Sequence, residues 1–474
     1  KSLPGGSWSP DVFVSFDAEG TAHIISHRSE MGQGIRTGLP AILADEMEAD
    51  WERVVVVQSV GDAKYGNQNT DGSWSVRGFM QRMREAGATV RHMLEQSAAQ
   101  QWGVDAAECA ASLHTVVHQP SGRVLDFKDL VAGAAELPVP GLELLSFKSP
   151  EQFRYIGKPL QIVDMHDMTH GTAQYGADTR LPGMKFAAIA RPPVVFGKVK
   201  SFDAEKTLAV SGVEQVVELP AAEPPAMFKA LGGIAVIASN SWAALKGRDL
   251  LSIEWDDGPN ADYDSAAYQQ ALLATVRQEG TKVRDEGNLD EALASAASTL
   301  QAEYYAPHLA HATMEPPACV ASVTADYCEI WAPSQDPQSL IPMAEAVTGL
   351  TAEQIRVNVT LLGGAFGRKS KCDFAEEAVF LSKQTGSPVL VQWSREDDIR
   401  HDYYHSVSAQ HLTAGLDADG AVTAWRHRLA YPSIMSTFDP SVKEAVAFEL
   451  GLGALNLPYD IPNLRIESGV AESK

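Results

Sequence analysis

The chain has 474 residues, of which 61 are acidic and 38 basic, and its formal net charge at neutral pH is -23. A negative charge of this size repels nucleic acid and anionic membrane surfaces, and no stretch of the sequence concentrates enough Lys and Arg to offset it. Hydrophobic residues make up 45% of the chain and charged residues 21%. This composition excludes a disordered or fibrous protein, and the length indicates about three domains.

The sequence contains no pattern for a metal cluster, a membrane span or a signal peptide. The four cysteines form no C-x-x-C pair and are predicted to be buried free thiols: Cys109, Cys319, Cys328 and Cys372. No apolar run reaches the roughly 18 residues of a membrane-spanning helix. Lys1 to Gly6 lack the basic and apolar regions of a signal peptide, but a signal already removed would leave no trace. The sequence alone therefore does not decide the compartment.

The N-terminal part combines strand patterns with a glycine-rich loop. Apolar and polar residues alternate over residues 12–25, which predicts a β-hairpin. The loop Met31-Gly32-Gln33-Gly34 follows. Apolar residues at helical spacing over residues 39–47 then predict an amphipathic helix, and four consecutive valines over residues 54–57 predict a buried strand.

A second polar loop, Thr70-Asp71-Gly72-Ser73-Trp74-Ser75, precedes a long predicted helix over residues 79–102. Methionines on one face of this helix, Met80, Met83 and Met93, are interpreted as core packing. Because the loop opens a helix, backbone N–H groups without helical partners favour an anionic group there.

Breaker-rich segments divide the remaining chain. The sequence Pro138-Val139-Pro140-Gly141 marks a first boundary, and the acidic stretch over residues 256–260 marks a second. Between them, residues 233–237 predict a strand and residues 242–245 a helix. We therefore predict an α+β fold with three parts: residues 1–140, 141–260 and 261–474.

The last part adds a third loop, Leu361-Leu362-Gly363-Gly364-Ala365-Phe366-Gly367-Arg368, and a glutamine, Gln335, within a Pro-Ser-Gln-Asp-Pro segment. Strands are predicted over residues 328–331, 355–361 and 389–393. Glycine lets the main chain approach a ligand closely, while Gln33, Ser73 and Ser75 can supply directed hydrogen bonds. Such loops suit a bulky anionic cofactor.

Together these segments resemble the molybdenum-binding large subunit of the xanthine oxidase and aldehyde oxidoreductase family, in particular its isoquinoline 1-oxidoreductase beta subunits and membrane-associated aldehyde dehydrogenases. The resemblance covers nearly the whole chain. It implies a multidomain architecture in which residues 1–140 are a permuted molybdopterin-binding segment. Residues 141–260 would be an inserted α/β hammerhead domain, and residues 261–474 the first molybdopterin-binding domain.

The resemblance also implies the site residues. Gln335 resembles the glutamine near the apical oxygen of molybdenum, and Phe366 resembles the aromatic ring that borders the substrate. The residues expected to bind the cofactor are Met31, Gly32, Gln33, Thr70, Gly72, Ser73, Trp74, Ser75, Gln335, Gly364, Ala365, Phe366 and Gly367. No residue of the chain is expected to ligate the metal directly, because the pterin dithiolene holds it.

Two departures from the family pattern limit these expectations. The family often carries a glutamate after the Gly364 to Gly367 loop, where this chain has Arg368-Lys369-Ser370, so xanthine is a poor substrate candidate. Residues 459–463, Tyr-Asp-Ile-Pro-Asn, resemble the strand that precedes the second molybdenum-binding half and its catalytic base, a glutamate. The chain stops at Lys474. We therefore expect either a fragment or a separate chain that supplies this half and the base.

The implied activity is hydroxylation of an aldehyde or an aromatic N-heterocycle with water-derived oxygen. The implied cofactor is molybdopterin with molybdenum, in the cytosine dinucleotide form. The implied partners are a small subunit with 2Fe-2S clusters, a second chain with the rest of the large subunit, a cytochrome and a small-molecule substrate. Relatives of this type are often exported folded, which favours the periplasm, with the cytoplasm as the alternative.

Two alternatives remain open. His308, His311 and Glu315 lie within eight residues and suggest a zinc-dependent hydrolase, but their spacing differs from H-E-x-x-H, and a structural role for Glu315 is preferred. The second alternative is a non-catalytic fragment or scaffold. The segment Gly367-Arg368-Lys369-Ser370 comes near a phosphate-binding G-K-S, but Arg368 breaks the required spacing.

Overall fold

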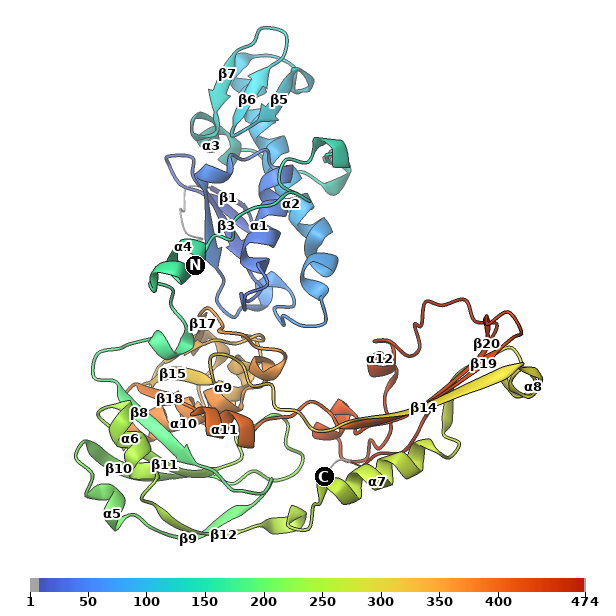
Figure 1. The fold of residues 1–474 in the computed structure, drawn as a ribbon. Coiled ribbons are helices and arrows are strands. Elements are labelled where there is room, and N and C mark those ends of the chain that lie inside the picture. The colour runs from blue at the N-terminus through green and yellow to red at the C-terminus, as the bar shows by residue number, and fades with distance from the viewer. Residues whose placement is uncertain (1–7, 473–474) are drawn as a thin grey trace. The chain divides into compact units, whose positions relative to one another are not determined.

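The computed structural model describes residues 8–472, so the segment Lys1 to Gly6 lies outside the described residues. The chain forms two compact units, each assembled from two separate stretches (Figure 1). The first unit comprises Lys1–Lys185 and Thr313–Gln392, and the second comprises Phe186–Ala312 and Trp393–Lys474. The sequence-based division at residues 140 and 260 stays a prediction.

The first unit begins with a four-stranded sheet of order β1-β2-β3-β4. Its strands are β1 (Trp8–Asp11), β2 (Val14–Phe16), β3 (Ala22–Ser26) and β4 (Val54–Gln58). β2 and β3 pair antiparallel, which confirms the predicted hairpin. β4 pairs parallel to β3 at the edge of the sheet, and Val55 is 44% exposed. The prediction of a buried strand at residues 54–57 is therefore wrong, because none of the four valines of this edge strand is buried.

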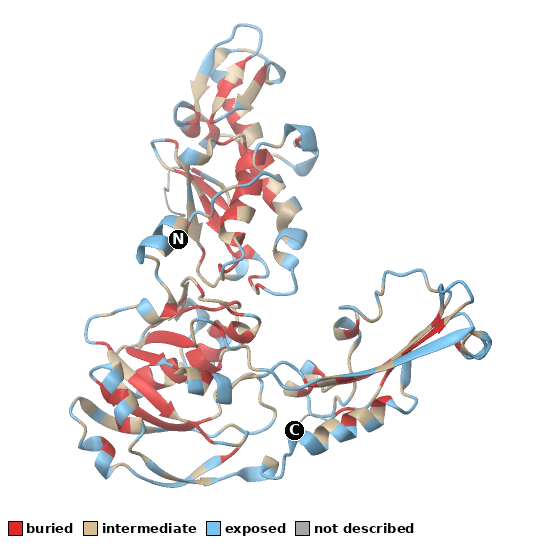
Figure 2. Ribbon diagram, viewed as in Figure 1, coloured by how far each residue is buried: buried red, intermediate tan, exposed pale blue. Residues whose placement is uncertain are grey.

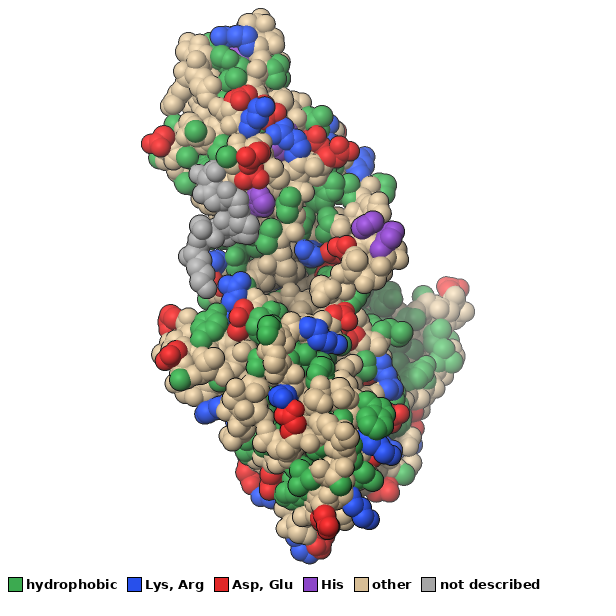
Figure 3. Space-filling model, turned by 90° about the vertical axis from the view of Figure 1, so that its left-hand side faces the viewer, with side chains coloured by type: hydrophobic (Ala, Val, Ile, Leu, Met, Phe, Trp, Pro, Cys, Tyr) green, Lys and Arg blue, Asp and Glu red, His purple; other side chains and the backbone are tan. Residues whose placement is uncertain are grey.

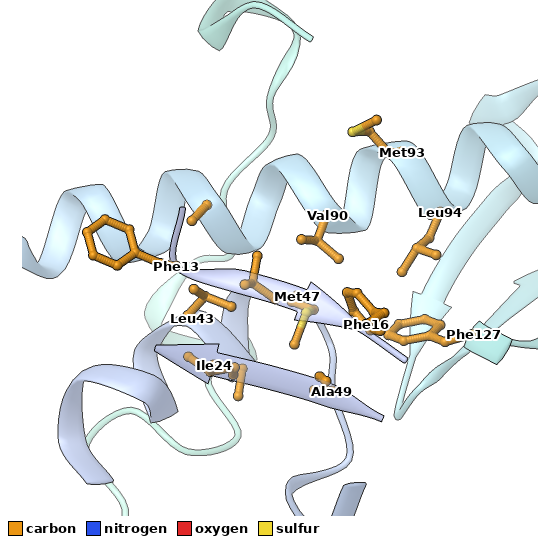
Figure 4. Close-up of a cluster of buried hydrophobic side chains, with 14 of the residues drawn as sticks. Phe13, Phe16, Ile24, Leu43, Met47, Ala49, Val90, Met93, Leu94 and Phe127 are labelled. Carbon is orange, nitrogen blue, oxygen red and sulfur yellow. The ribbon is translucent and has the colours of Figure 1, made fainter. Parts of the chain in front are cut away.

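Two helices cover this sheet, α1 (Ile35–Glu46) and α2 (Trp74–Trp102). The side chains of Met83, Val90 and Leu94 on α2 are fully buried and pack with Phe16 and Leu43 (Figure 4). This confirms that the methionine-bearing face belongs to the core. α2 begins five residues earlier than the sequence pattern predicted, directly at the polar loop.

The rest of the first unit contains two further sheets. The strands β5 (Cys109–Ser112), β6 (Thr115–His118) and β7 (Val124–Asp126) form a small meander beside α3 (Phe127–Ala135). A second set has the order β18-β15-β16-β17. It consists of β15 (Ala318–Val323), β16 (Cys328–Ala332), β17 (Ile355–Val359) and β18 (Val389–Gln392), with α9 (Leu340–Thr348) and α10 (Asp373–Thr385) packed against it. The three predicted strands of this region are confirmed, although β17 ends two residues early, where the glycine-rich loop begins.

The second unit is also α+β. Its hydrophobic strand β11 (Gly233–Ala238) lies between β8 (Lys185–Ala190) and β10 (Val213–Leu219), and α6 (Ser241–Arg248) packs on it. All six residues of β11 are buried, which confirms the predicted strand and helix (Figure 2). A five-stranded sheet follows the order β13-β21-β20-β19-β14, with α7 (Ser265–Val276) against it. Its strands are β13 (Thr281–Glu286), β21 (Asn463–Ser468), β20 (Val422–Ala430), β19 (Ser408–Leu416) and β14 (Ser298–Ala306).

The remaining sequence-based expectations concern thiols and charge. All four cysteines are free; Cys109, Cys319 and Cys328 are buried and Cys372 is half-buried. Among residues 8–472, none of the helices combines the length and the apolar character needed to cross a bilayer. On the face drawn in Figure 3, Lys and Arg side chains are interspersed with Asp and Glu side chains.

Candidate cofactor-binding site

Gln335 is the centre of the candidate site. It lies in the loop after β16 and its side chain is buried. Its Nε2 donates to the carbonyl oxygen of Thr70 at 2.8 Å, and its Oε1 accepts from the N–H of Gly367 at 3.0 Å. Its main chain accepts from Thr70 N (2.9 Å) and donates to the carbonyl oxygen of Lys369 (2.8 Å). One residue therefore joins the polar loop before α2 to the glycine-rich loop after β17.

The loop after β3 joins the same assembly through Ser29. Ser29 N donates to the hydroxyl of Thr70 at 3.0 Å, and Ser29 Oγ donates to the carbonyl of Ser334 at 2.7 Å, across 305 residues of sequence. Leu362 N donates to the carbonyl of Glu30 at 2.9 Å. All the loops predicted to bind a cofactor thus meet within the first unit.

The Met31 to Gly34 loop is built around the buried carboxylate of Glu30. Its Oε1 accepts from Gly32 N (2.8 Å) and Gly34 N (3.0 Å), and its Oε2 accepts from Arg36 N (2.9 Å). A carboxylate therefore already occupies the N-terminus of α1, where negative charge is stabilised. The sequence analysis missed this residue, although an acidic residue directly before a glycine loop that opens a helix is a recognisable signal.

The side chain of Gln33 also bonds within its own loop. Its Oε1 accepts from Met31 N at 2.8 Å, and its Nε2 donates to the carbonyl of Ser29 at 3.0 Å. Gln33 and Gly32 are both exposed, and a Cβ atom at Gly32 would meet nothing within 4 Å. The loop thus offers an open surface. A direct bond from Gln33 to a cofactor stays a prediction.

The loop before α2 leaves the helix N-terminus open. Ser73 is the N-cap residue with φ 56°, and no side chain caps the helix. Ser73 and Trp74 are exposed and Ser75 is half-buried. The guanidinium of Arg77 lies 4.2 Å from the centroid of the Trp74 ring, which adds a positive charge to the positive end of the helix dipole. This geometry favours an anionic group.

The glycine-rich loop presents a row of backbone donors. Gly364 (φ 81°) and Phe366 (φ 55°) both adopt the left-handed conformation, and Phe366 is 63% exposed. No described residue accepts a hydrogen bond from the N–H groups of Gly364, Ala365 or Phe366. Successive N–H groups in such a conformation form a concavity that binds anions or polarised oxygen atoms. For a non-glycine residue, the left-handed conformation of Phe366 is uncommon and indicates a functional constraint.

A buried cation lies beside the polar loop and was also missed from sequence. Arg28 is 2% exposed, its guanidinium donates to the carbonyl of Asn69, and it lies 5.0 Å from the centroid of the Phe79 ring. Burial lowers the pKa of Arg28, and the charges of Asp71 and Asp336 act in the opposite direction. An arginine keeps its charge in such surroundings, so Arg28 adds positive potential beneath the loop.

The three residues of the zinc alternative each contact residues outside that set. His311 Nδ1 lies 2.7 Å from Asp402 Oδ2, and His308 Nδ1 lies 3.3 Å from the carbonyl of His405. Glu315, which belongs to the other compact unit, pairs with Lys369 at 2.7 Å. Among residues 8–472, no group of three or more His, Cys, Asp or Glu side chains could hold a metal ion. These contacts give Glu315 the structural role that the sequence analysis preferred.

The two basic residues that follow Gly367, Arg368 and Lys369, have buried side chains. Arg368 makes a bidentate ion pair with Asp373, at 2.8 and 2.7 Å, and its side chain is fully buried. Since Lys369 is buried as well, neither cation of the Gly-Arg-Lys-Ser segment faces a phosphate. The burial of both cationic side chains thus agrees with the spacing of this segment, which differs from that of a P-loop.

Two distinct family models, each described as a molybdopterin cofactor-binding domain, match residues 274–472 and residues 4–177. Together they span more than three quarters of the chain. The four loops around Gln335 lie within these two matched regions.

Individual proteins give the same result. The chain is 29% identical over 91% of its length to a protein of Gluconacetobacter polyoxogenes named membrane-bound aldehyde dehydrogenase [pyrroloquinoline-quinone]. It is 28% identical over 97% of its length to the isoquinoline 1-oxidoreductase subunit beta of Brevundimonas diminuta. It spans 56% and 64% of the length of these two relatives.

Among solved structures, the aldehyde oxidoreductase of Desulfovibrio gigas matches with a TM-score of 0.52 at 20% identity. The match covers 73% of this chain and 42% of that one. At this identity the comparison shows the α+β fold alone.

Proposed function

Because the chain belongs to the molybdenum-binding subunits of the xanthine oxidase family, we propose that its first unit binds molybdopterin at the four loops gathered around Gln335. We further propose that the chain serves an oxidoreductase that hydroxylates an aldehyde or an aromatic N-heterocycle with water-derived oxygen. The observation that carries both proposals is the meeting of these loops, which places hydrogen-bond donors from distant parts of the sequence on one assembly.

The donors of this assembly fit an anionic, hydrogen-bonding cofactor. The three N–H groups from Gly364 to Phe366 have no partner among the described residues, and the N-terminus of α2 has no side-chain cap. Both features favour phosphate or heterocycle oxygen atoms. Open space at Gly32 leaves room for a ligand against the main chain. When bound, molybdopterin supplies a metal centre that carries out two-electron oxidation.

The residues of this chain would then bind the cofactor and orient the substrate. Gln335 holds the Thr70 and Gly367 loops together, and one hydrogen of its Nε2 remains for a further acceptor. The exposed ring of Phe366 offers a flat apolar surface for a planar substrate.

Finer features of the proposal rest on the relatives. The cytosine dinucleotide form of the cofactor, a partner subunit with 2Fe-2S clusters and a cytochrome as electron acceptor are proposed on family grounds. The names of the relatives describe a subunit and a membrane-bound enzyme, which supports an assembly with other chains and an association with a membrane. A location in the periplasm is proposed on family grounds.

Metal and cofactor analysis of the natively purified assembly tests the proposal. Elemental analysis should find molybdenum in a stoichiometric amount and no stoichiometric zinc. Mild acid hydrolysis should release cytidine monophosphate, and oxidation should yield a fluorescent pterin. Mass spectrometry should detect no pyrroloquinoline quinone, a cofactor that appears in the name of one relative. Quinone or zinc without molybdenum would refute the proposal.

Activity distinguishes the enzyme from a non-catalytic scaffold. The molybdenum-loaded assembly should reduce an artificial electron acceptor with an aromatic aldehyde or isoquinoline as substrate. Turnover in ¹⁸O-labelled water should place the label in the product. A fully loaded assembly that turns over neither substrate class would support the scaffold alternative.

A further inference from the structure

We propose that the buried ion pair between Glu315 and Lys369 positions the glycine-rich loop, so that the N–H groups of Gly364, Ala365 and Phe366 face a ligand. Insofar as that ligand is molybdopterin, the inference rests on the proposed function. Neither residue is among those predicted to contact the cofactor, so both act through the loop.

The contacts of Glu315 hold one end of the loop in place. Its Oε2 accepts from Lys369 Nζ at 2.7 Å and from Gly363 N at 3.0 Å, and its Oε1 accepts from Ala177 N at 3.3 Å. Its own N–H donates to the carbonyl of Gly363 at 2.9 Å. Gly363 is thus bound through both of its main-chain groups by one residue, directly before the three unpartnered N–H groups.

Lys369 connects this pair to Gln335. Its side chain is fully buried, and that of Glu315 is 11% exposed. The carbonyl of Lys369 accepts from Gln335 N at 2.8 Å and from the hydroxyl of Ser334 at 3.3 Å. The ion pair therefore links both ends of the loop, at Gly363 and at Lys369, and ties the second end to the residue that joins the other loops.

Gly363 leaves no space for adjustment. A Cβ atom at this position would lie 2.5 Å from the Cβ atom of Glu315, closer than such atoms ever approach. The main chain of Gly363 therefore packs directly against Glu315, whose carboxylate also accepts its N–H, and the ion pair can transmit its geometry to the loop. Since a buried ion pair often adds little stability over well-packed apolar residues, its geometric role is the better reason for its presence.

The experiment compares two double variants in the purified native assembly. Glu315→Gln with Lys369→Met removes both charges but keeps an oxygen that can accept from Gly363 N. Glu315→Leu with Lys369→Met removes both charges and the acceptor. Both variants remove the two charges of this pair together, so neither leaves one of them without the other. Amide hydrogen exchange of the peptide containing residues 361–367 measures the loop, and molybdenum content per chain measures retention of the cofactor.

We expect the loop peptide to exchange about tenfold faster in the leucine variant than in the glutamine variant, as the loss of one buried hydrogen bond implies. We also expect the leucine variant to retain several-fold less molybdenum. Equal exchange of the loop peptide in the two double variants would overturn the inference, and so would equal molybdenum content. If the wild-type assembly contains no molybdenum, the proposed function fails, while the exchange comparison still tests the positioning of the loop.

Two single variants complete the test. Asp373→Asn breaks the neighbouring Arg368–Asp373 pair, which is also buried but makes no bond to Gly363. It should lower the melting temperature without accelerating exchange of the loop beyond the rest of the unit. Gly363→Ala should accelerate exchange of the loop with both charged residues retained, because the added methyl group displaces Glu315 from the main chain. The opposite result for either variant would contradict the inference.

Discussion

Gln335 and Thr70, 265 residues apart in the sequence, are joined by two hydrogen bonds in opposite directions. The amide of Gln335 donates to the Thr70 carbonyl at 2.8 Å, and the Thr70 N–H donates to the Gln335 carbonyl at 2.9 Å. The pairing makes a glutamine side chain part of the main-chain hydrogen bonding between two loops. The two hydrogen bonds fix the relative position of the two loops.

We predict that Gln335→Met lowers the free energy of unfolding of the first unit by about 1–3 kcal/mol, because it leaves the buried carbonyl of Thr70 and the N–H of Gly367 without partners. Urea denaturation followed by fluorescence measures the change. Gln354→Met is a suitable control, since Gln354 also bonds two main-chain groups, Asp326 O and Thr351 N, but lies away from the loops. Gln354→Met should lose less stability, because water can replace its exposed hydrogen bonds, and only Gln335→Met should release the cofactor. Loss of cofactor in both would contradict a specific role for Gln335.

Glu30 gives a second prediction. Glu30→Ala should destabilise the first unit by about 1–2 kcal/mol, because it removes the acceptor for three N–H groups at the start of α1. The Met31 to Gly34 loop should become sensitive to limited proteolysis, which peptide mapping detects. Asp264 caps helix α7 in the second unit, where its side chain accepts from Ala267 N, and Asp264→Ala removes this cap. That control should cost comparable stability without exposing the loop, and equal cleavage of the loop in both variants would refute the prediction.

His27 makes the first unit sensitive to acid. Its ring lies between those of Phe13 and Phe79, with centroid distances of 4.9 and 4.3 Å, and among the described residues neither ring nitrogen has a hydrogen-bond partner. Burial, together with the charges of Arg28 and Arg82, lowers the pKa of His27 to about 3. The unfolded chain therefore takes up a proton below its ordinary pKa of about 6.5 while the folded chain does not, and stability falls as the pH drops from there toward 3.

Substitution of His27 should remove this dependence on pH. We expect His27→Phe to gain about 1.4 kcal/mol relative to wild type when the pH falls from about 7.5 to about 5.5. Urea unfolding at both pH values measures the difference. His166→Gln, at an exposed position on α4 (Met165–His170), serves as the control and should leave the dependence on pH as it is in the wild type. A wild-type protein equally stable at both pH values would rule out this assignment.

Asp45 fastens the segment that follows α3 to α1. Its buried carboxylate accepts from Lys148 Nζ (2.6 Å) and from the N–H groups of Arg154, Tyr155 and Ile156. Burial acts to raise the pKa of Asp45, but these hydrogen bonds outweigh it and hold the pKa below the ordinary value of 3.8. The stability it contributes is therefore complete above that value and is lost as the pH falls through the lower folded-state pKa.

Asp45→Asn should lower the free energy of unfolding by about 1–3 kcal/mol at neutral pH, because it weakens the buried hydrogen bonds to the Asp45 side chain while Lys148 keeps Glu48 as a charged partner. Calorimetry at neutral pH measures the loss. Asp129→Asn, on the exposed face of α3, should change the stability by less than about 0.5 kcal/mol. A small effect of Asp45→Asn would mean that Glu48, which lies 2.6 Å from the same ammonium, suffices for Lys148.

Local sequence patterns predicted much of the fold. The hairpin of β2 and β3, the methionine-bearing face of α2 and the buried strand β11 each follow from a periodicity within a single segment. β4 was misjudged because four valines look alike whether a strand lies inside a sheet or at its edge, and only the pairing of strands distinguishes the two. The start of α2 was placed too late because the hydrophobic pattern begins only at residue 79. The helix itself begins at Trp74, directly after the left-handed N-cap residue Ser73.

The sequence by itself predicted which loops would carry the proposed site, because their glycines and polar residues form recognisable motifs. Only the tertiary structure decided what those residues do, since their partners lie far away along the chain. Glu30 fills the helix end that a motif search leaves open, Gln335 binds two loops at once, and Lys369 faces inward toward Glu315. Hydrogen bonds and buried ion pairs depend on distances of a few ångströms between residues hundreds of positions apart, and no local pattern encodes those distances.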